Sequence, residues 1–155
     1  MLKLHWIELF LRGIPEMFLV IWGISIICKT YFSLKKYVFL GIVMSILTFL
    51  IRSLPIYFGV HTIIIITMDV IIMIIAGMPI VSSIYGTLVM FLSLSLSEFL
   101  NMLLLDFVGI NSTITPTDSI KKCILGIPSL VILFLIVIIL NYVITRREKF
   151  KDVSN

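Results

Sequence analysis

The segment 62–79 is apolar almost throughout, yet it contains one acidic residue, Asp69. A mostly apolar run of this length can cross the hydrocarbon core of a bilayer as an α-helix. An ionised carboxylate alone in hydrocarbon would cost several kcal/mol, so Asp69 has to face protein, pair with a partner or take up a proton. The segment therefore predicts a membrane helix that packs against other helices through its acidic face.

The whole chain has the composition of a membrane protein. Of its 155 residues, 61% are hydrophobic and 13% are charged, whereas soluble domains are about half apolar and a quarter charged. A helix of about 20 residues crosses the hydrocarbon, which leaves room for five or six helices and little else. We therefore predict an all-α fold, a single polytopic integral membrane helical bundle over residues 1–155 that contacts the lipid bilayer.

Charged residues, prolines and glycines divide the apolar sequence into five predicted spans. They cover residues 9–28, 37–58, 60–76, 81–105 and 124–144. Pro55 should kink or end the second span, because proline lacks the backbone donor that a helix needs. Residues 106–122 form the one sizeable predicted loop, and residues 145–155 form a basic tail. A sixth span within the first forty residues is the alternative, and it would move the N-terminus to the other side.

Lysine and arginine residues set the predicted orientation, because they favour the cytoplasmic side of a membrane. With loop 29–36 and the tail inside, seven basic residues are cytoplasmic: Lys29, Lys35, Lys36, Arg146, Arg147, Lys149 and Lys151. The other five basic residues lie on the outer side of the membrane or near it: Lys3, Arg12, Arg52, Lys121 and Lys122. This favours a multi-pass protein of the cell membrane with its N-terminus out and its C-terminus in. Cys28 and Cys123 then lie on opposite sides, which excludes a disulfide or metal site between them.

The polar residues inside the spans share a depth. Arg52, Asp69 and Glu98 each lie about six to eight residues below the outer end of their span, at 1.5 Å per residue. Arg12 and Glu16 lie one helical turn apart in the outer part of the first span. Helical spacing predicts three polar faces: Gly41, Ser45, Thr48 and Arg52; Thr62 and Asp69; and Thr87, Ser95, Glu98 and Asn101. Membrane helices turn such faces towards one another.

These polar residues have two compatible interpretations. In the first, they hold the helices together, with Arg52 paired to Glu98 or Asp69, since buried charges in membrane proteins usually pair. In the second, they line an outward-facing pocket for a zwitterion, a peptide or a cation. The candidate ligand-binding residues are Arg52, Asp69, Glu98, His61, Asn101 and Glu16, with His61 at the rim.

The sequence gives little support to catalysis. Its two histidines, His5 and His61, have no metal-ligand spacing, and there is no nucleophile elbow or phosphate-binding loop. We therefore predict no enzyme activity, no metal and no cofactor. Segments 17–27, 70–76 and 130–140 carry no ionisable group, which argues against a channel or proton pump, because these need polar groups across the whole depth. The basic residues flank apolar runs, so they suit lipid headgroups rather than nucleic acid.

Four short segments carry a resemblance to a known family. They are residues 14–16 (IPE), 52–62 (RSLPIYFGVHT), 98–101 (EFLN) and 126–130 (GIPSL). Together they resemble the N-terminal membrane sensor region of Firmicute histidine kinases of the peptide-responsive GHKL type. The printed sequence contains no phosphoacceptor segment and no nucleotide motif, so the resemblance implies a receptor or sensor module with an extracytoplasmic input rather than a kinase.

Two functions follow as hypotheses. The first is a non-enzymatic membrane sensing or regulatory module that signals through a partner such as a kinase or regulator. The second is the substrate-capture subunit of a small-molecule transporter that works with separate ATPases. A self-contained homo-oligomer is the remaining arrangement.

Overall fold

The structure is a computed structural model, and it describes residues 9–55, 57–108 and 119–153. Within these ranges the regular elements are all helices and there is no strand, which confirms the predicted all-α fold. A short π-helical turn, η1, precedes five α-helices. The elements are η1 (Leu9–Gly13), α2 (Ile14–Ile27), α3 (Leu34–Ser53), α4 (Phe58–Ile75), α5 (Ile80–Phe107) and α6 (Ser119–Val153).

Every predicted span coincides with a helix, but only some helices have the length of a full membrane crossing. Among the described residues, three segments are long and apolar enough to cross a membrane: Leu34–Ser53, Ile80–Phe107 and Ile124–Arg147. The apolar helices Ile14–Ile27 and Gly59–Ile75 are shorter. The structure therefore supports membrane localisation through three helices, whereas five crossings stay a prediction.

Helix α6 differs most from its predicted bounds, because it begins five residues early, at Ser119, and continues through the predicted basic tail to Val153. Helix α3 also differs from its predicted bounds. It ends at Ser53 rather than at residue 58, because Leu54 precedes Pro55 and adopts an extended conformation (φ −71°, ψ 141°). It also begins three residues early, at Leu34, so that Lys35 and Lys36 belong to its first turn rather than to a loop. The predicted loop 106–122 is shorter at both ends, since α5 continues to Phe107 and α6 begins at Ser119. Residues 109–118 lie outside the described residues.

Helix α2 is the centre of the bundle. It packs against α3, α5 and α6, and its buried side chains Met17, Ile21 and Ile24 meet apolar side chains from the other helices. Glycine allows two helices to approach closely at Gly23, where an added Cβ would overlap the Met90 sulfur of α5. Such small residues at crossings are typical of packed membrane helices.

The outside of the bundle is strongly apolar. Large side chains such as Ile63, Val81 and Ile139 are at least 60% exposed. They are examples from a surface on which α3, α4, α5 and α6 all expose isoleucine, leucine or valine side chains, whereas the central helix α2 exposes none of its large apolar side chains. Soluble monomers rarely expose continuous apolar patches of this kind. The surface therefore suits contact with lipid.

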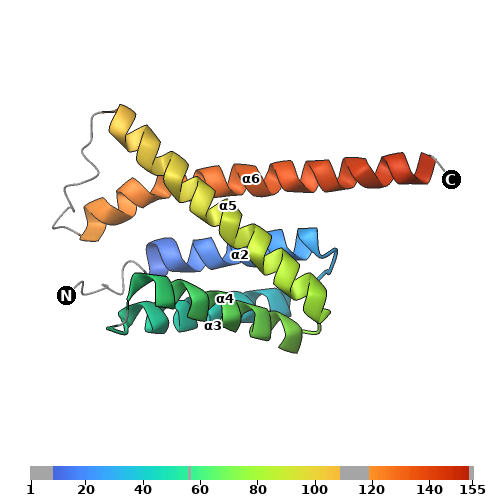
Figure 1. Cartoon of the computed structure of the whole chain (residues 1–155), viewed down its shortest axis with the longest axis horizontal. Helices are drawn as coiled ribbons and strands as arrows, with labels where there is room; N and C mark the ends of the chain where they lie inside the picture. The colour runs from blue at the N-terminus through green and yellow to red at the C-terminus, as the bar shows by residue number, and fades with distance from the viewer. Residues whose placement is uncertain (1–8, 56, 109–118, 154–155) are drawn as a thin grey trace.

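The bundle has two unlike ends (Figure 1). At the Arg12 end lie η1, the turn between α3 and α4, and the beginning of α6; at the Lys36 end lie the turns from α2 to α3 and from α4 to α5. Helix α6 is bent near its start and continues past the Lys36 end of the bundle. The bend accompanies Pro128 inside the helix.

Backbone turns and side chain-to-backbone bonds close the Lys36 end. Gly77 has φ +98°, and the N–H groups of Gly77 and Met78 donate to the carbonyls of Ile74 and Met73. This pattern is a Schellman motif, which satisfies the last carbonyls of α4. The Lys36 ammonium donates to the Ala76 carbonyl at the same helix end, where a cation also interacts favourably with the helix dipole.

Candidate functional site

Four charged residues meet at the Arg12 end, and we call them the ion-pair cluster: Arg12, Glu16, Arg52 and Glu98. Arg12 belongs to η1, Glu16 to the first turn of α2, Arg52 to the last turn of α3, and Glu98 to α5. Pro15 lies in the first turn of α2, where a missing N–H costs no helical bond. The cluster thus joins segments that are far apart in the sequence.

Arg12 is the centre of this cluster. Its Nη2 donates to Glu98 Oε1 at 2.5 Å, and its Nε lies 3.5 Å from Glu16 Oε2. Arg52 Nη2 lies 3.6 Å from Glu16 Oε1 on the other side. Both Glu16 oxygens are buried and make no hydrogen bond within the described residues. The Glu16 carboxylate is therefore held between two guanidinium groups by charge rather than by short hydrogen bonds.

The cluster is buried at one side and open at the other. The Glu16 side chain is 1% exposed, whereas those of Arg52 and Glu98 are 38% and 45% exposed. Two cations and two anions give a formal charge of zero, so an incoming charged group can bind only by exchanging partners with a residue already there. The open Arg12–Glu98 pair is the easier one to exchange, because exposed pairs contribute little free energy.

The pairing differs from the predicted one. Arg52 pairs with Glu16 rather than with Glu98 or Asp69, and Glu98 pairs with Arg12. Arg12 was not among the predicted ligand-binding residues. Its spacing of four residues from Glu16 is the sequence signal that points to it, because residues at i and i+4 share one helix face.

Asp69 lies apart from the ion-pair cluster. It occupies the middle of a buried face of α4, between Ile65 and Met73, and is 2% exposed. No ion pair to Asp69 occurs within the described residues, and its Oδ2 is buried without a hydrogen-bond partner there. The structure thus separates Asp69 from Arg52 and Glu98, with which the sequence grouped it.

His61 and Asn101 both contact backbone. His61 Nε2 lies 2.9 Å from the Leu54 carbonyl oxygen, so the ring bridges the turn between α3 and α4. Asn101 Nδ2 donates to the Leu125 carbonyl at 3.0 Å and ties α5 to the start of α6. That carbonyl lies three residues before Pro128, where the helical bonding of α6 is interrupted.

The predicted polar faces are only partly right. Gly41, Ser45 and Thr48 are buried, as the spacing on α3 predicts. Ser95 and Thr62 are exposed, so the faces predicted through them on α5 and α4 are wrong at these positions. Thr87 and Asn101 of the predicted face on α5 are buried. The buried polar side chains of this helix are Ser83, Thr87, Ser93, Ser97 and Asn101.

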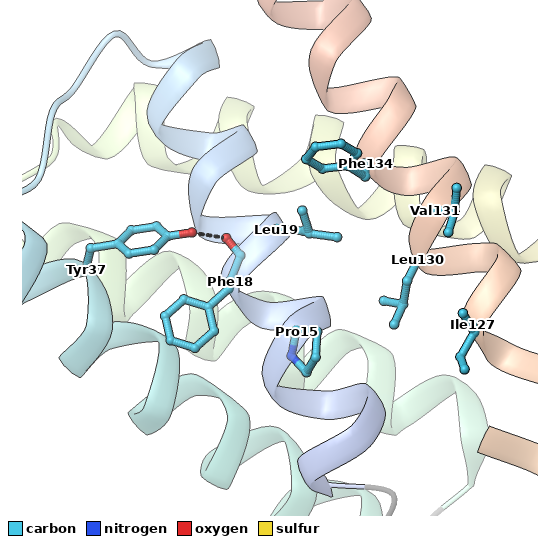
Figure 2. A pocket seen from close by; sticks show the side chains of 8 residues that line it. All are labelled: Pro15, Phe18, Leu19, Tyr37, Ile127, Leu130, Val131 and Phe134. Carbon is cyan, nitrogen blue, oxygen red and sulfur yellow. Dashed lines mark hydrogen bonds between the residues drawn. The ribbon is translucent and has the colours of Figure 1, made fainter. Parts of the chain in front are cut away.

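The structure also has an apolar groove of about 420 Å³ over α2, between α3 and α6. Figure 2 shows the side chains that line it and the Tyr37 hydroxyl, which donates to the Phe18 carbonyl at 2.6 Å. The lining residues are Pro15, Phe18, Leu19, Tyr37, Ile127, Leu130, Val131 and Phe134. The predicted ligand-binding residues are not among them.

Within the described ranges, histidine, cysteine and acidic side chains form no group of three that could hold a metal ion. No protein-family model, curated protein or solved structure matches this chain. The resemblance to the sensor region of histidine kinases stays a prediction.

Proposed function

We propose that the chain is a non-enzymatic sensing or regulatory module of a bacterial cell membrane, with an extracytoplasmic N-terminus and a cytoplasmic C-terminus. In this proposal the ion-pair cluster is the input and α6 is the output. A signal that exchanges partners with Arg12 or Glu98 changes how α5 and α6 pack, and the cytoplasmic end of α6 passes that change to a partner protein.

The observation that carries the proposal is the position of Arg12. Its guanidinium bonds Glu98 of α5, and a Cβ added at Gly126 of α6 would lie 3.3 Å from Arg12 Nη1. One side chain therefore contacts the two helices that meet at this end of the bundle. Intramembrane charges are expensive and usually mark functional positions, so a half-open cluster at a helix junction is a suitable input site.

Helix α6 is suited to carry the change. At 1.5 Å per residue its 35 residues extend about 52 Å, from the Arg12 end to beyond the Lys36 end of the bundle (Figure 1). Its start is held by Asn101 and by the packing of Gly126 on Arg12. Its last turns expose Arg146, Arg147 and Lys149, which could bind an acidic partner surface or anionic headgroups.

The partner is tested by crosslinking in the native membrane, followed by purification of the chain and mass spectrometry. We expect a kinase or a response regulator to be crosslinked, and its crosslinks to map to the last turns of α6. A paired ATPase would contradict the proposal and favour the transporter subunit. Recovery of this chain alone would also contradict it and indicate a homo-oligomer.

The input is tested by Glu98→Gln, with Ser95→Ala as the matched control on the same helix. Glutamine keeps the size of the side chain but removes the charge that holds Arg12, whereas Ser95 is exposed and outside the cluster. We expect the transcript profile of cells that express Glu98→Gln to differ from wild type, and that of Ser95→Ala to match it. Equal profiles for all three chains, at equal membrane levels, would contradict the role of the cluster.

A further inference from the structure

Three buried oxygen atoms on α4 and α5 have no hydrogen-bond partner within the described residues. They are Asp69 Oδ2, Ser83 Oγ and Thr87 Oγ1. Asp69 is 2% exposed, and Ser83 and Thr87 are each 0% exposed. Buried polar atoms in proteins are almost always bonded, so three unbonded oxygens on two neighbouring helices require an explanation.

The two hydroxyls are unusual for this chain. Seven other helical hydroxyls each donate to a carbonyl three or four residues earlier in their own helix: Ser25, Ser45, Ser53, Thr67, Ser93, Ser97 and Ser129. This local bond is the ordinary solution for serine and threonine inside a helix. Ser83 and Thr87 do not make it, so their oxygens are free to accept or ligate.

Register brings Asp69 and Thr87 to a similar depth on neighbouring helices, with Ser83 one turn away. Helices α4 and α5 pack against each other and are joined by the short connection 76–79. Asp69 lies six residues before the end of α4, and Thr87 lies seven residues after the start of α5. At 1.5 Å per residue both are about 10 Å from the connection. Ser83 is one turn nearer to it, on the same face of α5 as Thr87.

No ion pair reaches Asp69 from the residues that the structure describes. The buried side chains of α2, α3 and α5 that form the interior are apolar or uncharged polar, except for Glu16. Glu16 is itself held by Arg12 and Arg52. A carboxylate buried in this way has to be neutralised by a bound cation or by a proton.

We propose that Asp69, Ser83 and Thr87 form an internal binding site for one sodium ion between α4 and α5. Three oxygen ligands favour a hard cation. A single carboxylate is balanced by one positive charge, whereas a divalent ion would leave a net charge buried. Oxygens that share a cation do not bond to one another, which matches the three unbonded atoms. A proton would also neutralise Asp69, but the single O–H of the protonated carboxyl group can donate to only one of the two hydroxyl oxygens. This site is independent of the proposed signalling role.

The experiment is thermal unfolding of the full chain in lipid nanodiscs, followed by tryptophan fluorescence, in sodium chloride and in choline chloride at equal ionic strength. A ligand that binds only the folded state raises the unfolding midpoint as its concentration rises. At about pH 8, where a carboxylate is normally ionised, we expect the midpoint to increase with sodium but not with choline. The same midpoint in both salts would overturn the proposal.

Variants locate the site. Asp69→Asn should abolish the sodium response, and Thr87→Val should raise the half-saturating sodium concentration on the order of tenfold, as for other weakened metal sites. Ser93→Ala is the matched control, because Ser93 is a buried hydroxyl of α5 that bonds its own backbone, and it should leave the response unchanged. If Asp69→Asn does not fold, Thr87→Val still decides the question.

Two results would overturn the sodium site. One is a sodium response of Thr87→Val equal to that of wild type. The other is stabilisation of wild type on lowering the pH to about 5 together with no sodium response at about pH 8, which would show that Asp69 takes up a proton instead.

Discussion

Both ends of the bundle have bonds from side chains to backbone carbonyls, but among the described residues the ion pairs all lie at one end. At the Arg12 end, side chains from three distant parts of the chain pair through their charges, and residues 12 and 98 are bonded across 86 positions. At the Lys36 end, turns bond to their own helices, and Lys36 and Cys28 donate to backbone carbonyls. Backbone bonds fix one geometry, whereas ion pairs can exchange partners. The proposed input therefore lies at the end whose charged partners can exchange.

The largest expected effect comes from removing the centre of the ion-pair cluster. Arg12→Gln leaves the buried Glu16 with Arg52 alone, and removal of one member of a buried pair should cost about 3 kcal/mol of unfolding free energy. The double variant Arg12→Gln with Glu16→Gln should recover part of this loss, because it removes the unbalanced charge. Reversible unfolding in mixed micelles measures both, and a double variant less stable than the single one would contradict this account of Glu16.

The Lys36 end should be sensitive to backbone rather than to charge. Gly77 has φ +98°, and a Cβ added there would meet only the Lys36 ammonium at 4.0 Å. Gly77→Ala should therefore cost about 2 kcal/mol through backbone strain alone. The same unfolding assay tests this, and a loss of stability that depends on salt would indicate that charge matters at this end as well.

Loss of the open pair should change stability little. Glu98→Gln removes the bond to Arg12 at a side chain that is 45% exposed, and such pairs contribute about 0.5–1 kcal/mol. We expect the wild-type protein to lose a similar amount at high salt, because salt screens exposed charges. If Glu98→Gln lost as much unfolding free energy as Arg12→Gln, the open pair would be held as firmly as the buried one. The Arg12 end would then have no easily exchanged pair, and the comparison between the ends would lose its basis.

The smallest expected effect is a gain. Lys29 has φ +54° at the end of α2, a conformation that costs a side-chain-bearing residue about 1–2 kcal/mol. Glycine removes this strain but adds about 0.5–1 kcal/mol of chain entropy in the unfolded state. Lys29→Gly should therefore stabilise the protein by about 0.5 kcal/mol in the same assay. A loss of stability would show that the contacts of the Lys29 side chain outweigh the strain.

Secondary structure was largely predictable from the sequence. Apolar runs separated by lysines, Gly77 and Pro79 locate all five helices, because apolar length and helix-breaking residues act locally. The ends were less predictable: Leu54 stops α3 ahead of Pro55, and α5 and α6 extend into the predicted loop. The buried face of α3 was also predictable, since Gly41, Ser45 and Thr48 recur at helical spacing.

Three residues of the ion-pair cluster were among the predicted site residues, but its central residue Arg12 and the pairing were not. The sequence placed Glu16, Arg52 and Glu98 at one depth, and the structure brings them together through Arg12. It also placed Asp69 at this depth, but Asp69 lies on the buried face of α4, apart from the ion-pair cluster. Depth follows from counting residues along each helix, whereas partners depend on how each helix is rotated about its axis.

The sequence by itself determined that this chain forms apolar helices, and that a few charges lie inside them, because both follow from residue type and order. Only the tertiary structure decided which charges meet. Rotation and crossing of the helices are fixed by close contacts such as those of Gly23 with Met90 and Gly126 with Arg12. These contacts join residues far apart in the chain, and no local pattern specifies them.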